Sequence, residues 1–234
     1  MSRRFEPSDL PKHRNGITPG MVGRYPDYNV LDEMRHWDEV TRSVVLQRVE
    51  SMPPIRFFDE HEAATLRPLT EHLTGQVGED PKIPVLEFVD EKLFHRNYDG
   101  YRYFDMPEDR ETWKTVARGL DEEARKLGHE SFALLGDHEQ NEICHRFSEG
   151  KLFGGAWATL NVSRAFSVVM RYCCEQYYSH PWSWNEIGFG GPAYPRGYAH
   201  FGSPHLKHGD TEAWEGIEAY ELDPVEDTKR RGLD

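Results

Sequence analysis

The sequence predicts an all-α protein: a helical bundle of five or six helices with a long irregular N-terminal arm and an aromatic, Gly/Pro-rich C-terminal tail. Apolar residues recur at helical spacing through the middle of the chain, and no stretch alternates as a strand would. The 20 Gly and 15 Pro concentrate irregular structure toward the two ends. We therefore expect an extended arm over 1–30, a bundle domain over 31–179 and an irregular docking tail with a mobile end over 180–234.

The first helical pattern extends from Asn29 to Glu50, and Ser51-Met52-Pro53-Pro54 ends it. Its expected inward positions are Val30, Met34, Trp37, Thr41, Val44, Val45 and Val49. The second helix begins at Asp59, because Glu62 stands three residues later, as in a capping box. Pro68 lies inside this helix and is expected to kink it.

Four further segments complete the expected bundle. Pro84 opens a helix whose apolar face is Val85, Phe88, Val89 and Leu93. A longer helix follows from Glu108 to Leu127, with Leu127 facing inward and Gly128 at its end. Asp137, with Gln140, is expected to cap the next segment. After Gly154-Gly155, the apolar positions from Trp157 to Tyr177 predict the central helix.

Charge and hydropathy exclude several classes of function. The formal net charge of -13 argues against binding to nucleic acid or to an anionic membrane surface. No run of 18 apolar residues is present, so we expect no membrane span. Arg3-Arg4 resembles the start of a twin-arginine export signal, but no apolar run follows it, so we expect no working signal peptide in this chain.

Cysteine usage predicts neither a disulfide framework nor a zinc ribbon, because the chain has three cysteines and no CxxC motif. Cys173 and Cys174 are adjacent in a helical pattern and point in different directions. A single bridge from Cys144 to Cys173 or Cys174 stays open, and buried free thiols are the preferred interpretation.

Two patterns could bind a metal. Glu142-x-x-His145 has the spacing of a di-metal carboxylate bundle, but a second copy is missing, so a solvated helix face is favoured. His200, His205 and His208 form a second string, in a Gly- and Pro-rich tail that offers no rigid support. We find no dinucleotide-binding GxGxxG after a strand and no P-loop. The chain is therefore expected to hold no catalytic residue, no cofactor and no metal.

The stretch from Tyr177 to Phe201 combines many aromatic residues with Gly and Pro, so we expect it to contain no helix. A segment this apolar must be covered, either by the chain's own helices or by another protein. Trp and Tyr often anchor protein interfaces, which favours a second protein as the cover. The candidate partner contacts are Trp182, Trp184, Asn185, Ile187, Phe189, Tyr194 and Tyr198, with Tyr25, Tyr28 and Trp37 as a secondary contact.

The sequence resembles the gluconate 2-dehydrogenase subunit 3 family. The likeness rests on Phe57-Phe58-Asp59-Glu60-His61-Glu62, on residues 84–90 (PVLEFVD) and, most specifically, on the stretch from Tyr177 to Tyr198. In that stretch the matching residues are Trp182, Trp184, Asn185, Glu186, Ile187, Gly188, Phe189, Gly191, Pro192 and Tyr198.

The resemblance implies a non-catalytic small subunit that binds and stabilises a large FAD-binding catalytic subunit of a sugar or glycoside dehydrogenase of the glucose–methanol–choline type. It also implies that electrons pass to a cytochrome c or another acceptor subunit. The complex would be periplasmic if a signal-bearing partner exports both chains, and cytoplasmic otherwise. Two alternatives are a metal-dependent helical-bundle enzyme that uses Glu142 and His145, and a scaffold protein with an unrelated partner.

Overall fold

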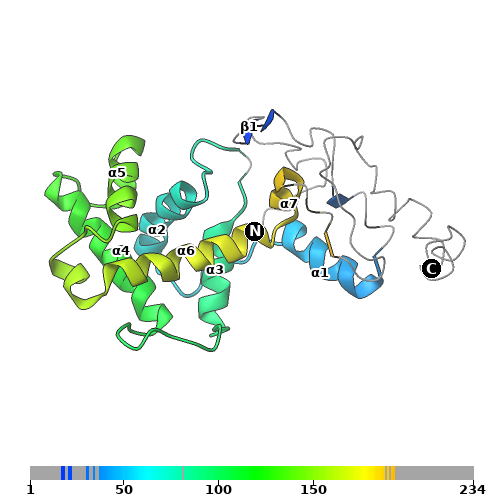
Figure 1. The fold of residues 1–234 in the computed structure, drawn as a ribbon, viewed down its shortest axis with the longest axis horizontal. Coiled ribbons are helices and arrows are strands. Elements are labelled where there is room, and N and C mark those ends of the chain that lie inside the picture. The colour runs from blue at the N-terminus through cyan, green and yellow to red at the C-terminus, as the bar shows by residue number, and fades with distance from the viewer. Residues whose placement is uncertain are drawn as a thin grey trace, which may run out of the picture. The chain divides into compact units, whose positions relative to one another are not determined.

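The computed structural model describes residues 17–18, 21–22, 30–31, 34, 37–80, 82–187, 189 and 191–192. Contacts divide the chain into two compact units (Figure 1). Unit 1 joins the described residues up to Ser51 to those from Tyr178 onward, and unit 2 is Met52–Tyr177. The boundaries predicted at residues 30 and 179 stay predictions.

The predicted all-α class is confirmed, since the described residues contain seven α-helices and only one pair of two-residue strands. The strands, β1 (Ile17–Thr18) and β2 (Met21–Val22), are antiparallel, with Ile17 opposite Val22. Unit 1 contains α1 (Glu39–Glu50) and α7 (Pro181–Ile187). The helices of unit 2 are α2 (Glu60–Leu73), α3 (Val85–Phe94), α4 (Asp109–Lys126), α5 (Asp137–Ser148) and α6 (Val162–Tyr178), with short 3-10 helices η3 (Phe132–Leu134) and η4 (Gly155–Thr159).

The core of unit 2 forms where α2 packs against α3, α4, α5 and η3 (Figure 1). Its largest fully buried side chains are Trp113, Trp157, Tyr172, Phe132 and Phe147. Trp157 lies against Gly119 of α4, where an added Cβ would come within 2.5 Å of the indole. Only glycine at position 119 therefore lets η4 approach α4 this closely.

Several helix ends form as the local sequence predicts. Asp59 caps α2 by accepting a hydrogen bond from the Glu62 N–H, while the Glu62 carboxylate accepts from the Asp59 N–H. Gly128 follows α4 with a φ of +90°, the left-handed conformation that glycine adopts easily. α3 buries Val85, Phe88, Val89 and Leu93, as expected from its apolar face.

A buried carboxylate joins α3 to the segment that precedes α2. The Asp90 side chain is fully buried and accepts hydrogen bonds from the backbone N–H groups of Arg56, Phe57 and Phe58, at 2.8, 2.9 and 2.8 Å. These N–H groups have no helical partner, so the carboxylate replaces the water that would otherwise solvate them. Asp90 thereby positions the entry to α2.

The start of α1 differs from the prediction. The helix begins at Glu39 instead of Asn29, because Asp38 takes an extended conformation and accepts a hydrogen bond from the Thr41 N–H, as an N-cap does. Val45 and Val49 are buried as expected, but Val44 is 60% exposed. Val30 and Trp37 are buried although they precede the helix.

The expectation that no helix forms in the Gly- and Pro-rich stretch is wrong for one segment. α6 ends at Tyr178, one residue beyond the apolar pattern that predicted it, but a further helix, α7, forms over Pro181–Ile187. Proline fits at the first position of a helix, since the N–H that it lacks would have no helical acceptor there, and the glycines begin only after Ile187.

Three smaller boundary predictions are also wrong. Trp157 belongs to η4, so the central helix begins at Val162. Gly136, and not Asp137, is the N-cap residue of α5, and the Glu139 carboxylate accepts a hydrogen bond from its N–H. Leu127 is 50% exposed, because α4 ends at Lys126 and Leu127 no longer follows its buried face.

Replacing Asp90 with alanine should destabilise unit 2. The substitution leaves three backbone N–H groups without an acceptor, and we expect it to lower the free energy of unfolding by about 2–4 kcal/mol. Urea unfolding followed by circular dichroism measures this change. Glu142→Ala, on the exposed face of α5, is the control and should change stability by less than about 0.5 kcal/mol. Equal stability of both variants would contradict the role of Asp90.

Candidate functional site

The aromatic segment of unit 1 is tied to residues from the other end of the chain. The Asn185 side chain, 1% exposed, accepts a hydrogen bond from the Val30 N–H at 2.7 Å. Gly191 lies against Val30 and Trp37, where an added Cβ would come within 3.0 Å of both side chains. α1 also packs against α7 (Figure 1). Segments more than 150 positions apart in sequence thus form one unit.

The tryptophans predicted as partner anchors are buried. Trp182 and Trp184 are 4% and 9% exposed. Trp184 donates its indole N–H to the Tyr178 carbonyl at 2.7 Å and meets the Phe189 ring edge-on at 5.4 Å. Trp182 packs edge-on against His180 at 5.3 Å. In unit 1 these rings form part of a packed core.

The other predicted contacts of this segment differ in exposure. Ile187 is 44% exposed and Phe189 is half-buried, whereas Trp37 is 4% exposed. Tyr25, Tyr28, Tyr194 and Tyr198 lie outside the described residues. The role of all these residues in binding a partner stays a prediction. α1 adds two exposed side chains one helical turn apart, Val40 and Val44.

His180 is a buried, neutral imidazole at the start of α7. Its Nδ1 accepts a hydrogen bond from the Trp182 N–H at 3.2 Å. Burial, together with the positive charge of Arg48, lowers the pKa of His180 to about 3. The imidazole is therefore uncharged at neutral pH.

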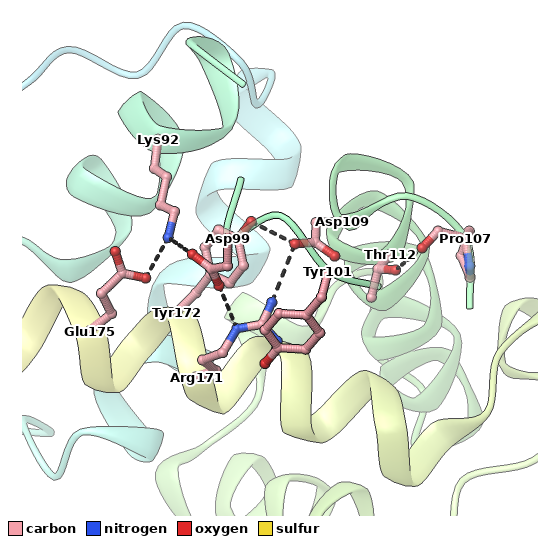
Figure 2. A network of polar contacts seen from close by, with 9 residues as sticks. All are labelled: Lys92, Asp99, Tyr101, Pro107, Asp109, Thr112, Arg171, Tyr172 and Glu175. Carbon is pink, nitrogen blue, oxygen red and sulfur yellow. Dashed lines mark hydrogen bonds and ion pairs between the residues drawn. The ribbon is translucent and has the colours of Figure 1, made fainter. Parts of the chain in front are cut away.

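A network of charged side chains in unit 2 holds the loop between α3 and α4 (Figure 2). Lys92 of α3 binds Asp99 of the loop at 2.7 Å and Glu175 of α6 at 2.5 Å. Burial alone would lower the pKa of Lys92, but hydrogen bonds to both carboxylates raise it overall. Lys92 is therefore a permanent cation that links α3, the loop and α6.

Arg171 of α6 forms the second half of this network. Its Nε binds Asp99 at 2.8 Å, its Nη1 donates to the Tyr101 hydroxyl at 2.7 Å, and its Nη2 lies 3.4 Å from Asp109 (Figure 2). Tyr172 also donates its hydroxyl to Asp109, at 2.7 Å. Burial and this hydrogen bond to Asp109 raise the pKa of Tyr172, so the phenol stays a donor.

Every charged group of the network faces a partner, since the two cations Lys92 and Arg171 bind three carboxylates, and such pairing suits a structural role better than acid–base chemistry. Asp99 faces two cations, and Asp109 faces Arg171 and a phenol. A second clamp lies further along the loop, where Asp105 pairs with Arg164 and accepts a hydrogen bond from Asn161 at 3.1 Å. Together, these contacts hold the loop between α3 and α4 in one conformation.

The sequence analysis did not identify this network. Its one visible signal in the sequence is the pair Arg171 and Glu175, which stand four residues apart in a helical pattern and so share a face. Their partners come from a loop without regular structure, and periodicity carries no information about such contacts. Asp99 had no recognisable partner in the sequence.

The three cysteines are free thiols. Cys144 and Cys173 are buried, and burial raises the pKa of Cys144 to about 12 and raises that of Cys173 as well. A thiol reacts and binds metals as the thiolate, so both are unreactive at neutral pH. The bridge that the sequence left open is not formed.

Among the described residues, the candidate metal ligands do not come together into a site. Glu142 is exposed, and His145 is 64% exposed and 3.7 Å from Glu149. Among the described residues, no group of three or more His, Cys, Asp or Glu side chains could hold a metal ion. His200, His205 and His208 lie outside those residues.

In the part of the chain that the structure describes, no helix combines the length and apolar character that a membrane crossing requires.

Acidification should destabilise unit 1 through His180. Because its folded pKa lies below the ordinary value of about 6.5, the unfolded chain binds a proton that the folded chain does not, and stability falls as the pH drops below 6.5. Between about pH 7.5 and pH 5 the loss is about 2 kcal/mol. Urea unfolding of wild type and His180→Gln at both pH values measures it. The variant should lack this part of the pH dependence, and an unchanged pH dependence would contradict the assignment.

Removing the Arg171 guanidinium should loosen the loop. Arg171→Met takes one cation from Asp99 and the donor from Tyr101, at a cost of about 1–3 kcal/mol for this partly buried group. Hydrogen exchange measured by mass spectrometry should become faster between residues 98 and 105. Arg125→Met, at an exposed position of α4, is the matched control. Faster exchange in both variants, or in neither, would contradict the role of Arg171.

One of three comparisons with known proteins finds a match. The family model described as gluconate 2-dehydrogenase subunit 3 matches residues 60–191, which is more than half of the chain and extends from α2 to Gly191. Searches of curated proteins and of solved structures find no match. The family model is enough to decide membership, and it confirms the resemblance. The chain belongs to the gluconate 2-dehydrogenase subunit 3 family.

Proposed function

We propose that this chain is the non-catalytic small subunit of a sugar or glycoside dehydrogenase, and that it binds and stabilises a large FAD-binding catalytic subunit. Membership of the gluconate 2-dehydrogenase subunit 3 family carries the proposal, because the family name indicates a subunit of a multi-subunit dehydrogenase complex. The accessory role is supported by the polar network of unit 2, in which the charged groups are paired with one another.

The flavin belongs to the partner in this proposal. A dinucleotide site is built from a strand, a glycine-rich turn and the start of a helix. In the described residues the strands are two residues long and belong to a hairpin, so this part of the chain does not fit FAD. A cytochrome c or another acceptor subunit would take the electrons from the flavin. The compartment of the complex would be that of the large subunit.

The surface of unit 1 is the proposed contact with the large subunit. Val40, Val44 and Ile187 are exposed apolar side chains in this unit, and exposed apolar groups gain free energy when a partner covers them. Trp182 and Trp184 are buried, so they would contribute to binding indirectly, through the packing that positions α7. Tyr25, Tyr28, Tyr194 and Tyr198 complete the proposed set.

Co-expression tests the proposal directly. The proposal expects a neighbouring gene for a large flavoprotein. When that protein is tagged and co-expressed with this chain, the two should co-purify with FAD bound to the tagged subunit. The yield of folded flavoprotein should fall when the small chain is omitted. If both chains are expressed and the tagged flavoprotein, with FAD bound, elutes without this chain, the proposed function is contradicted.

Two matched variants test the contact in unit 1. Val44→Asp introduces a charge on the exposed face of α1 and should weaken the complex at least about tenfold. Leu134→Asp, at a position in unit 2 that is 61% exposed, should change binding less than about twofold. Isothermal titration calorimetry gives both affinities. Equal affinities would contradict the assignment of the contact to unit 1.

A further inference from the structure

The loop between α3 and α4, residues 95–107, presents large aromatic side chains to solvent, and we call it the aromatic loop. Phe104 is 92% exposed and Tyr101 is 57% exposed. Phe94, at the end of α3 just before the loop, is 41% exposed. An exposed phenylalanine contributes nothing to the stability of the chain that carries it. Two such rings on one short loop indicate a surface that is covered when the protein works.

Ion pairs and hydrogen bonds of the polar network fix the aromatic loop, and they reach Asp99 and Tyr101 within it (Figure 2). Lys92 and Arg171 bind Asp99, and Arg171 also donates to Tyr101. Arg164 pairs with Asp105 and lies 5.4 Å from the centre of the Phe104 ring. Because the loop is already ordered, binding costs little further conformational entropy.

The composition of the loop matches that of binding hot spots. Tyrosine, phenylalanine and arginine are enriched at the centres of protein interfaces, while lysine and glutamate are depleted there. The segment from Arg96 to Phe104 contains three tyrosines, one phenylalanine and two arginines. A hollow of about 250 Å³ lies beside the exposed rings and could take a side chain of a partner; it is lined by Tyr98, Gly100, Tyr101, Arg102, Glu108 and Asp109.

The charge of the loop indicates the chemistry of its partner. Arg96 and Arg102 are exposed, and Asp99 is already engaged by Lys92 and Arg171. Asp105, the other carboxylate of the loop, pairs with Arg164, so both carboxylates of the loop already face cations while its two arginines point to a partner, in a chain whose net charge is -13. A complementary surface is apolar at its centre and carries carboxylates at its rim. The net charge of the whole chain disfavours a nucleic acid as the partner, and a second copy docked through the same loop would bring its exposed arginines against those of the first.

We propose that the aromatic loop is a second docking surface for the large flavin-bearing subunit, with Phe104 and Tyr101 as its apolar anchors and Arg102 paired with a carboxylate of that subunit. This inference rests on the proposed function. The loop belongs to unit 2, whereas the contact proposed above belongs to unit 1, so the two surfaces can be tested separately. Lys92 and Arg171 are positioning residues, since they act through the loop.

The experiment uses the full chain and the tagged large flavoprotein of the co-expression test. Binding is measured by isothermal titration calorimetry for wild type, Phe104→Ala, Arg102→Glu and the control Phe153→Ala. Phe153 is also a phenylalanine of unit 2 and is 72% exposed, but it lies between α5 and η4. Thermal unfolding should give the same midpoint for all four chains, because the three side chains are exposed.

Phe104→Ala should raise the dissociation constant at least about tenfold, and Phe153→Ala less than about twofold. Arg102→Glu should weaken binding more at low salt than at high salt, because an exposed charge pair is screened by ions. If wild type binds and both loop variants bind with its affinity, the loop is not a docking surface, although the proposed function stands. If wild type itself does not bind the flavoprotein, the function fails and this inference fails with it.

Discussion

Carboxylates that accept several hydrogen bonds hold the connections of unit 2. Asp90 binds three successive backbone N–H groups ahead of α2. Asp121, in α4, accepts from the Thr65 hydroxyl and from the Phe132 N–H, both at 3.0 Å. Asp99 holds the aromatic loop in a similar way, by pairing with Lys92 and Arg171. A backbone polar group that leaves water needs an acceptor, so these side chains decide where the segments between helices can lie.

The aromatic residues of the chain divide into two groups with different physical roles. Trp182 and Trp184 are rigid, buried and hydrogen-bonded or ring-packed, so they give unit 1 its shape. Tyr101 and Phe104 are exposed on a loop that cations hold in place. A ring that is already buried stabilises the subunit, while an exposed ring on an ordered loop is available to a partner. Composition alone does not separate these roles.

Helix positions in unit 2 could be predicted because their signals are local. The Asp59 and Glu62 pair marks the start of α2, and Gly128 marks the end of α4, since capping involves residues within one turn of each other. Predictions based on composition were weaker. The Gly and Pro content after Tyr177 concealed α7, whose seven residues contain neither glycine nor a proline beyond the first position. The helical pattern from Asn29 likewise continued past Asp38, the residue that caps α1.

By itself, the sequence determined the all-α class, the main helices of unit 2 and the family. Periodicity, helix caps and motifs depend on residues that are close together in the sequence, so they can be recognised without the structure. Only the tertiary structure decided which aromatic residues are buried and which charges meet. Val30 and Asn185 stand 155 positions apart and share a hydrogen bond, and Arg171 reaches a loop 70 positions earlier. Such pairs are selected by packing of whole helices, and no local pattern records them.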